Sequence, residues 1–264
     1  MLEYGFPVNA ELKVPRALVL RVHRFLIRLA VRFERLPDEM VVNGGTLLSE
    51  HPVKHGGFSN VYRGRFKDSN GDDVEVALKV LKIFEDQTDE SRRVLNKKIV
   101  KEAFVWQYAR HKNVVPFLGV DITTFPSKAM VSPWMPLGSV LSYMGQHSPS
   151  CSRALTSKQL DDVIQGLVYL HSIDIVHGDL CGRNILIDKD GRARLTDFGL
   201  AGFIDSQTSV KSSTRGGSTR WMAPELILPP PGGRFERTPE SDVLAFGCFS
   251  CEVRLSSPCS KNST

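Results

Sequence analysis

The spacing of apolar residues changes near the middle of this 264-residue chain, and this change constrains the fold more than any other feature. Several segments between residues 47 and 134 alternate apolar and polar side chains, as strands with one buried face do. After residues 136–139, the apolar residues recur mainly at helical intervals. The pattern predicts an α+β fold of two lobes with a cleft between them, a small antiparallel β lobe followed by a mainly helical lobe.

Individual elements follow from the local patterns. In the first half we expect a helix at residues 90–110 and strands at residues 47–53, 59–66, 74–82, 114–120 and 129–134. Asn70 and Gly71 form a hairpin turn between two of these strands. In the second half, Thr156 or Ser157 caps a helix that reaches His171. A second hairpin, residues 185–188 and 193–196, follows that helix and turns at Asp190 and Gly191.

Residues 1–45 are expected to form an N-terminal extension, and residues 46–264 a single domain with a small lobe at 46–135 and a large lobe at 136–264. Within the extension, residues 15–36 show the helical period of an amphipathic helix. One side is basic and the other apolar, the latter formed by Leu18, Val22, Phe25, Leu29, Phe33 and Leu36. We favour docking of the apolar side on the following domain; the alternative is contact with an anionic membrane or a partner protein.

The composition is that of an ordinary globular protein, and its formal net charge of +5 is modest. Much of this charge lies in residues 1–36, so nucleic-acid binding is not expected. The five cysteines are scattered and odd in number, which favours free thiols in a reducing compartment. Cys248 and Cys251 fit one face of a helix better than a metal site. No secretory signal or membrane span is evident, so the expected location is cytoplasmic.

Several short motifs then occur in a fixed order. They comprise Gly56-Gly57-Phe58-Ser59-Asn60-Val61-Tyr62, Val76-Ala77-Leu78-Lys79, Glu102 with its neighbours, residues 131–135, residues 177–186, Asp197-Phe198-Gly199, residues 220–225 and residues 241–247. This ordered set resembles the signature of the eukaryotic protein kinases. The Trp221-Met222-Ala223-Pro224-Glu225 segment and the Gly178-Asp179 pair are similar to the tyrosine-kinase-like group. The resemblance implies the bilobal kinase fold, ATP and Mg²⁺ as cofactors, and a protein substrate.

By this resemblance, the nucleotide is held by residues of several motifs. Lys79 grips the α- and β-phosphates and is fixed by Glu102, although a surface ion pair along its own helix is the alternative for Glu102. The adenine lies between an apolar ceiling and a floor, with Ser132 as gatekeeper. The full nucleotide-binding set is Gly56, Gly57, Val61, Ala77, Lys79, Pro133, Met135 and Leu186.

The resemblance also assigns catalytic roles. Asp179 is the base that accepts the proton of the substrate hydroxyl, Asn184 and Asp197 are the magnesium ligands, and Arg183 neutralises the transferred phosphate. We expect the γ-phosphate to be transferred to serine or threonine, and tyrosine is the other acceptor considered. The competing hypothesis is a catalytically impaired, pseudokinase-like module for nucleotide binding or scaffolding.

Some positions depart from the family pattern. Lys54 and Ser59 replace two glycines of the phosphate loop. Gly178 replaces the arginine that binds an activation-loop phosphate, so control through Ser212, Ser213 or Thr214 is not favoured. The sequence after Gly247 lacks the last helices of the family's large lobe, and with them the arginine partner of Glu225. We therefore expect a buried, unpaired carboxylate at Glu225, open apolar faces and a marginal or aggregation-prone fold, with activity compromised to that extent.

Overall fold

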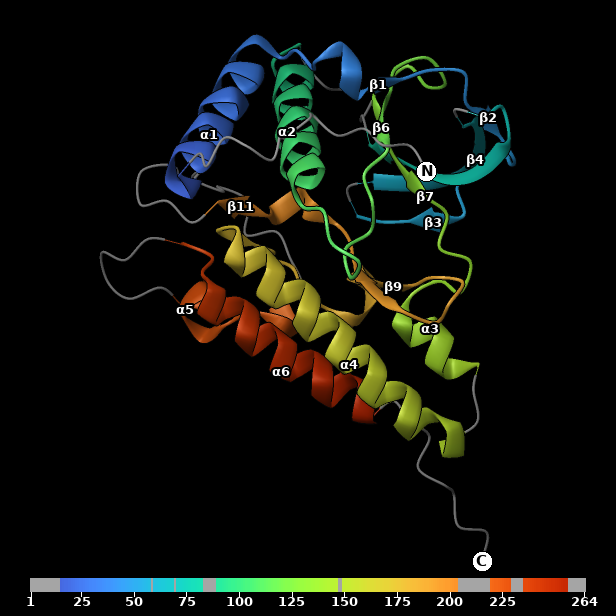
Figure 1. The fold of residues 1–264 in the computed structure, drawn as a ribbon, viewed down its shortest axis with the longest axis vertical. Coiled ribbons are helices and arrows are strands. Elements are labelled where there is room, and N and C mark those ends of the chain that lie inside the picture. Colours follow the sequence, from blue (N-terminus) through green and yellow to red (C-terminus); the bar gives the residue numbers. More distant parts are fainter. Residues whose placement is uncertain are drawn as a thin grey trace, which may run out of the picture. The chain divides into compact units, whose positions relative to one another are not determined.

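The computed structural model describes residues 15–57, 59–68, 70–82, 89–146, 149–203, 219–228 and 235–255. Its contacts divide the chain into two compact units. The strand-rich unit comprises Met1–Gln107 and Phe117–Trp134, and the helical unit comprises Tyr108–Pro116 and Met135–Thr264. Figure 1 shows a curled sheet in the former and long helices in the latter. The predicted α+β class is confirmed.

One sheet organises the strand-rich unit. Its strands are β1 Val41–Val42, β2 Thr46–Leu47, β3 Lys54–His55, β4 Ser59–Lys67, β5 Asp73–Leu81, β6 Gly119–Asp121 and β7 Ala129–Pro133. They run in the order β1-β6-β7-β5-β4-β2, with β3 also paired to β4. All pairs are antiparallel except β1 with β6. Alternation along β5 buries Val76 and Leu78 on one side, and they form a core cluster with Ala129 and Val131 of β7, a strand that is buried on both sides.

The strands expected at residues 59–66, 74–82 and 129–134 are confirmed as β4, β5 and β7. The strand expected at residues 47–53 is wrong beyond Leu47: β2 ends at Leu47, and β3 begins only at Lys54, after a segment that contains Pro52. Proline lacks the N–H that a ladder needs. The strand expected at residues 114–120 is also wrong in part, because Pro116 interrupts it and β6 begins only at Gly119.

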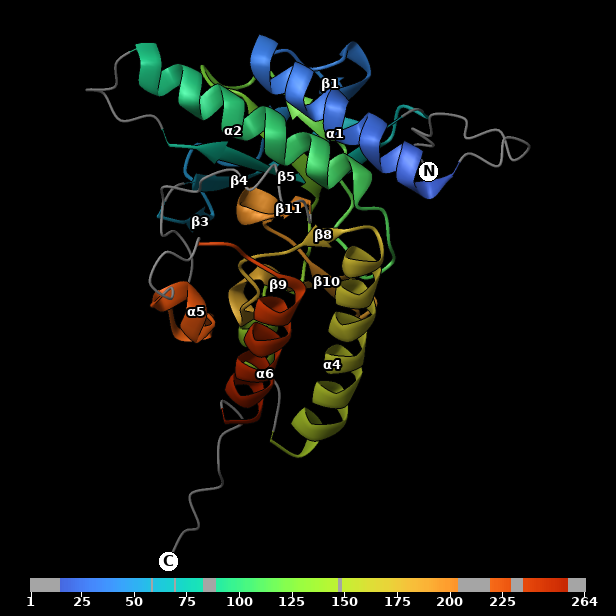
Figure 2. The same ribbon diagram turned by 90° about the vertical axis from the view of Figure 1, so that its left-hand side faces the viewer.

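Two helices belong to the strand-rich unit, α1 Arg16–Phe33 and α2 Asp89–Tyr108, and they run beside each other in Figures 1 and 2. Glu34, in the left-handed region with φ 54°, ends α1. The favoured docking of the predicted apolar side of α1 is wrong. Phe25 and Phe33 on that side are 59% and 64% exposed, whereas Leu20 and Ile27 on the opposite side are buried. A short 3-10 helix, η1 Asp38–Met40, leads into β1.

The helical unit is built on α4 Pro149–Ser172 and α6 Pro239–Leu255, which lie side by side in both ribbon views (Figures 1 and 2). Because α4 begins at Pro149, the cap predicted at Thr156 or Ser157 is wrong, and proline suits a first helical turn. The other elements are α3 Val140–Gly145, α5 Pro224–Ile227, β8 Ile175–Val176, β9 Ile185–Ile187, β10 Ala193–Leu195, β11 Gly202–Phe203, η2 Gly182–Asn184, η3 Phe198–Leu200 and η4 Thr219–Trp221.

The predicted second hairpin is confirmed as β9 and β10, which pair antiparallel. Gly191 has φ +71° in its turn, a conformation that favours glycine. Asp188 closes this turn, because its Oδ1 accepts from the backbone N–H groups of Asp190 and Arg192, both at 2.9 Å. The side chain of Arg194 donates to Asp188 Oδ2 at 2.8 Å, which fixes the strands that follow and precede the turn.

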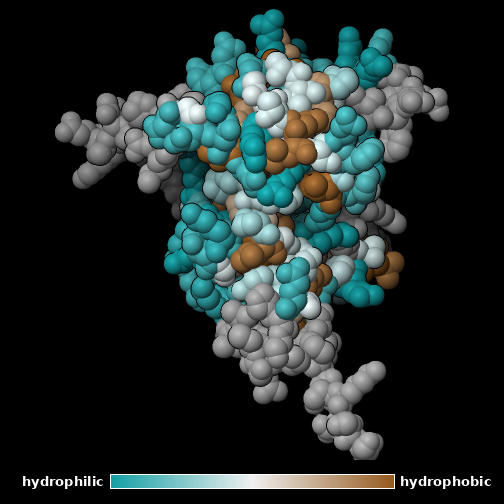
Figure 3. Space-filling model, turned by 90° about the vertical axis from the view of Figure 1, so that its right-hand side faces the viewer, coloured by the Kyte–Doolittle hydropathy of each residue, from teal (hydrophilic) through white to brown (hydrophobic). Residues whose placement is uncertain are grey.

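The surface corrects one expectation and supports another. Glu225 on α5 is exposed, so the predicted buried and unpaired carboxylate is wrong, since its oxygens keep their water. Apolar side chains do lie open on α4 and α6, with Val168 62% and Val243 60% exposed. The face in Figure 3 is mainly hydrophilic, with separate hydrophobic areas. Within the described ranges, no helix has the length and apolar character needed to traverse a bilayer.

Candidate functional site

A buried ion pair joins the sheet to α2 in the strand-rich unit. Lys79 on β5 donates from Nζ to Glu102 Oε1 on α2 at 2.8 Å, and the two side chains are only 15% and 4% exposed. The predicted pairing of these residues is present, and the surface ion pair considered for Glu102 does not apply. Removing two charges from water is costly unless they are paired, so the contact fixes the position of the ammonium group.

Val61, Ala77 and Lys79 share one face of the sheet. Val61 is directly opposite Lys79 in the antiparallel register, and Ala77 precedes Lys79 by two positions on the same strand. This face is only partly buried, whereas the opposite face, with Val76 and Leu78, is completely buried. Ser132 on β7 pairs with Ala77 in the register of the sheet. An apolar surface with an ammonium group beside it therefore forms on β4 and β5.

The expected phosphate loop joins β3 to β4. Gly56 N–H donates to the carbonyl of Ser59 at 2.7 Å, and a Cβ on Gly56 would lie 3.0 Å from that carbonyl oxygen. Gly57 has open space where a Cβ would lie. Phe58 of the same motif is outside the described residues. Small residues at this turn keep the backbone N–H groups accessible to a ligand.

The motif at residues 131–135, which the family pattern assigns as the hinge that contacts adenine, begins within β7. The N–H of Trp134 donates to the carbonyl of Glu75 at 3.0 Å, so this donor is used within the sheet. The ring of Trp134 lies under the guanidinium of Arg63, whose carbon is 5.1 Å from the ring centre. Pro133 contributes no N–H, and Met135 is buried with its carbonyl bound to Gly138 N–H at 3.1 Å. Leu186 on β9 is half-buried and bridges to Ser139.

The helical unit brings Asp179 and Asn184 together. The side-chain amide of Asn184 donates from Nδ2 to the backbone carbonyl of Asp179 at 2.8 Å and to its Oδ2 at 3.1 Å. Asn184 is buried at the end of η2, immediately before β9. Because Nδ2 faces Asp179, the amide oxygen is the group that Asn184 can present to a cation.

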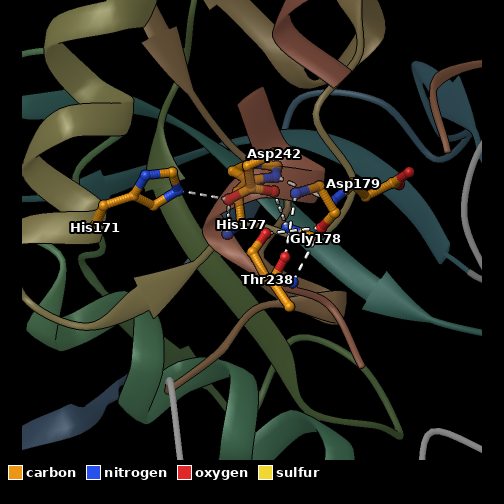
Figure 4. A network of polar contacts seen from close by, with 7 residues as sticks. His171, His177, Gly178, Asp179, Thr238 and Asp242 are labelled. Carbon is orange, nitrogen blue, oxygen red and sulfur yellow. Dashed lines mark hydrogen bonds and ion pairs between the residues drawn. The ribbon is translucent and has the colours of Figure 1, made fainter. Parts of the chain in front are cut away.

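Asp242 on the first turn of α6 holds the backbone of this loop. Its Oδ2 accepts from the N–H of His177 at 2.8 Å and its Oδ1 from the N–H of Gly178 at 2.9 Å. His171 Nε2 on α4 lies 2.9 Å from the same Oδ2. Figure 4 shows these contacts converging on Asp242 while the carboxylate of Asp179 points away from them. The backbone before Asp179 is thus fixed, and its carboxylate remains directed outward.

Asp197 lies in the left-handed region, with φ 71°, between β10 and η3. The preceding residue, Thr196, connects it to the loop: its N–H donates to Asn184 O, and its carbonyl is 3.0 Å from His177 Nε2. Phe198 is buried against His177, with ring centres 5.6 Å apart. A non-glycine residue with positive φ is uncommon and persists only where the surrounding structure holds it in place, which suits a functional carboxylate.

The donor set of Asn184 and Asp197 fits Mg²⁺, which takes oxygen ligands and usually completes its shell with waters and substrate phosphates. In the part of the chain that the structure describes, no three His, Cys, Asp or Glu side chains gather into a metal-holding group. A protein cage for a metal is therefore absent from the described residues. One amide oxygen and one carboxylate match a cation that arrives with a phosphorylated ligand.

Other loop residues have distinct surroundings. Arg183 is exposed on η2, whereas Cys181 is completely buried. A pocket borders Asp179 and is lined by Leu180, Trp221, Met222, Ala223, Leu226 and Ala245 among others. Residues 204–218, which include Ser212, Ser213, Thr214 and Ser218, are outside the described residues.

Sequence reasoning missed two residues that support the loop. Glu252 on α6 accepts from Gly182 N–H and from Trp221 Nε1, both at 3.2 Å on the same oxygen. Arg237, just before α6, donates from Nε to the carbonyl of Gly178 at 2.9 Å. Both are distant in sequence from their partners, and no local pattern marks them. Only the packing of α6 against the loop reveals them.

Comparison with known proteins agrees with this geometry. Residues 47–262 match the family model of protein tyrosine and serine/threonine kinases. The serine/threonine-protein kinase STY46 of Arabidopsis thaliana is 33% identical over 82% of this chain and 34% of its own length. The mitogen-activated protein kinase kinase kinase A of Dictyostelium discoideum is 30% identical over 84% of this chain and 23% of its own length. The melanoma receptor tyrosine-protein kinase of Xiphophorus maculatus is 29% identical over 75% of this chain and 16% of its own length.

The chain therefore spans about a third or less of the length of these relatives. The match covers both units, and it includes the motifs on which the expected resemblance was based. The expected likeness to the tyrosine-kinase-like group is confirmed by relatives of this kind. This chain belongs to the protein tyrosine and serine/threonine kinase family.

Proposed function

We propose that the protein transfers the γ-phosphate of ATP to serine or threonine hydroxyls of a protein substrate. The observation that carries the proposal is the contact between Asn184 and Asp179, which holds an outward-facing carboxylate beside an amide oxygen suited to Mg²⁺. A scaffold would not need a carboxylate and an amide oxygen side by side in this way. The proposal is consistent with the family to which the chain belongs.

Each side chain has a definite task in this proposal. The ammonium group of Lys79, fixed by Glu102, attracts nucleotide phosphates. In the strand-rich unit, Val61 and Ala77 provide an apolar surface for the base and Pro133 a polar contact, and the family pattern assigns Met135 and Leu186 of the helical unit to nucleotide binding as well. Because Gly56 and Gly57 have no side chains, the nucleotide phosphates can approach the backbone of the phosphate loop. Asn184 and Asp197 hold Mg²⁺, which when bound neutralises charge on the phosphates.

Asp179 orients the acceptor hydroxyl and accepts its proton, since its backbone is fixed by Asp242 while its carboxylate faces outward. The pocket beside Asp179, bordered by Trp221 and Met222, is where the acceptor residue would be received. Arg183 is exposed on the same loop and supplies positive charge toward the transferred phosphoryl group. Positioning and electrostatic stabilisation, rather than covalent catalysis, account for the proposed rate enhancement.

The proposal is tested with purified protein, Mg-ATP and a generic protein acceptor. We expect a thermal shift with Mg-ATP and phosphate transfer that Asp179→Asn reduces by about 10²-fold or more. Phosphoamino-acid analysis of the product should yield phosphoserine or phosphothreonine. Phosphotyrosine alone would contradict the acceptor assignment. A thermal shift with transfer no faster than that of Asp179→Asn would instead support the nucleotide-binding scaffold.

A further inference from the structure

Gly178, directly before Asp179, has φ +79°, and because it has no side chain a neighbouring residue can lie close to the loop here. A Cβ built on Gly178 would lie 2.5 Å from Cδ and 3.2 Å from Nε of Arg237. It would also lie 2.9 Å from the carbonyl oxygen of Leu200. The side chain of Arg237 therefore occupies the place that any side chain at position 178 would need.

Arg237 is held in this place by several contacts. Its Nε donates to the carbonyl of Gly178 at 2.9 Å, and its guanidinium carbon lies 5.0 Å from the ring centre of Phe235. Partial burial lowers the pKa of Arg237, and the negative charges of Asp179 and Asp242 act in the opposite direction. The guanidinium thus loses water but gains two carboxylates and a carbonyl as neighbours, which offset part of its desolvation.

The segment that carries Arg237 is itself fixed. Thr238 and Ser241 cap α6 reciprocally, since Thr238 N–H donates to Ser241 Oγ at 3.0 Å and Ser241 N–H donates to Thr238 Oγ1 at 3.3 Å. The same turn of α6 places Asp242 under the loop. Arg237 and Asp242 therefore hold the two peptide units on either side of Gly178: Asp242 binds the N–H of Gly178 and Arg237 binds its carbonyl.

We propose that Arg237 is the positioning residue of the catalytic loop and supplies, from the start of α6, the guanidinium that position 178 lacks. Its hydrogen bond fixes the peptide that precedes Asp179, and its positive charge lies near the carboxylate of Asp179. This proposal rests on the proposed function, because it deepens the role of Asp179. Since both contacts come from the folded helical unit, the loop is held in place without a phosphate on another segment.

The test compares Arg237→Gln, Arg237→Lys and the matched control Arg254→Gln, an exposed arginine at the other end of α6. Rates are measured at 20 °C and normalised to the folded fraction, because a destabilised variant also loses activity. We expect kcat of Arg237→Gln to fall about 10²-fold with an unchanged KM for ATP, as for a misplaced catalytic group. Arg237→Lys keeps the charge and should recover most of this loss. Equal kcat values for Arg237→Gln and Arg254→Gln would overturn the proposal, and a lysine variant no better than glutamine would refute the role of charge.

A second measurement does not need activity. Hydrogen–deuterium exchange of residues 177–182 should accelerate about tenfold or more in Arg237→Gln and remain unchanged in Arg254→Gln. Unchanged exchange in Arg237→Gln would reject the brace even in an active enzyme. If the wild-type protein transfers no phosphate but this exchange still accelerates, the proposed function fails while the positioning of the loop by Arg237 stands.

A different observation carries a second inference. The side of α1 that faces away from its own unit is apolar, because Leu18, Val22, Phe25, Leu29 and Phe33 are all exposed. Arg21, Arg28, Arg32 and Arg35 are also exposed and flank this apolar row along one edge. The opposite side of the helix, with Leu20 and Ile27, packs into the protein. An exposed apolar row bordered by arginines complements a surface that is apolar below and negatively charged above.

We infer that α1 binds the surface of an anionic lipid bilayer. Phenylalanine and leucine side chains would enter the boundary between head groups and acyl chains, and the arginines would contact the lipid phosphates. Such binding is peripheral, and the arginines strengthen it at an anionic surface.

Vesicle sedimentation tests this inference. The wild-type protein should bind vesicles of phosphatidylcholine with 30% phosphatidylserine at least about tenfold more tightly than phosphatidylcholine alone. Both Phe25→Ser with Phe33→Ser and Arg21→Gln with Arg32→Gln should abolish this preference, while the exposed control Arg254→Gln should not. Binding that survives either double substitution would refute the inference. Self-association lost with the phenylalanines, without vesicle binding, would show that a second copy of the chain covers the helix instead.

Discussion

The carboxylate of Asp242 accepts a hydrogen bond from the backbone N–H of Gly178 at 2.9 Å. The same carboxylate also accepts from His177 N–H and lies 2.9 Å from His171 Nε2. One buried side chain on α6 therefore determines where the backbone before Asp179 lies. The catalytic loop owes its geometry to a residue more than sixty positions away in the sequence.

Asp242→Asn should destabilise the helical unit and displace the loop. The substitution replaces one acceptor oxygen by an amide that faces a donor, and hydrogen bonds to buried charged groups contribute about 1.5–3 kcal/mol each. We expect the free energy of unfolding to fall by about 2–4 kcal/mol. Urea denaturation followed by circular dichroism measures this change. A decrease in the free energy of unfolding smaller than that of the exposed control Asp190→Asn would contradict the bracing role.

Lys79→Met should lose phosphate transfer and also stability, because it leaves Glu102 buried without its partner. Breaking a buried pair on one side costs about 3–5 kcal/mol. The double variant Lys79→Met with Glu102→Leu should regain much of this stability without regaining activity. Thermal unfolding and transfer assays on both variants separate the two effects. An additive loss of stability in the double variant would show that the pair is not coupled.

Asp188 makes the stability of the β9–β10 turn depend on pH. Burial acts to raise the pKa of Asp188, but hydrogen bonds from Arg192 N–H and the Arg194 side chain outweigh it and hold that pKa below its ordinary value. A carboxyl with a lower pKa in the folded than in the unfolded protein stabilises the fold above the unfolded pKa of about 4. This contribution is lost as the pH falls through the folded pKa.

Asp188→Asn should therefore be less stable than the wild type at pH 6, by about 1 kcal/mol. The difference should shrink steadily as the pH is lowered from 5 to 2, because the wild-type carboxyl then becomes protonated as well. Chemical denaturation at a series of pH values tests this. A difference that stays constant over this range would show that the charge of Asp188 does not contribute.

Val168 and Val243 are exposed apolar residues on α4 and α6. Replacing both with glutamine should change the free energy of unfolding by no more than ordinary surface substitutions do, about 0.5 kcal/mol each. Self-association should decrease, because less apolar surface is presented to solvent. Analytical ultracentrifugation over a range of concentrations measures this effect. A large loss of stability would indicate that these side chains are packed in the folded protein.

The sequence predicted the elements whose causes are local. Strands β4 and β5 follow from alternation, the turn at Gly191 from a residue that tolerates positive φ, and the pairing of Lys79 with Glu102 from the motif around each. Predictions that depended on distant packing were less reliable. The helical period of α1 was correct, but which side faces the protein depends on the surface it meets. Glu225 was expected to be buried on family grounds, and the structure exposes it.

Arg237 illustrates why part of the site lies beyond sequence reasoning. The glycine at position 178 was recognisable as a departure, but nothing near Arg237 indicates that it fills the resulting space. Its position depends on the capped start of α6 and on the left-handed backbone at Gly178. Such compensation between distant positions becomes visible only when the two segments are folded together.

The carboxylate of Glu252 has a consequence for communication within the helical unit. One of its oxygens accepts from both Gly182 N–H and the indole of Trp221. Because Gly182 N–H and the indole of Trp221 share this acceptor oxygen, a movement of Trp221 also changes the hydrogen bond of Gly182. The pocket that Trp221 borders and the turn that carries Arg183 are thereby linked thermodynamically.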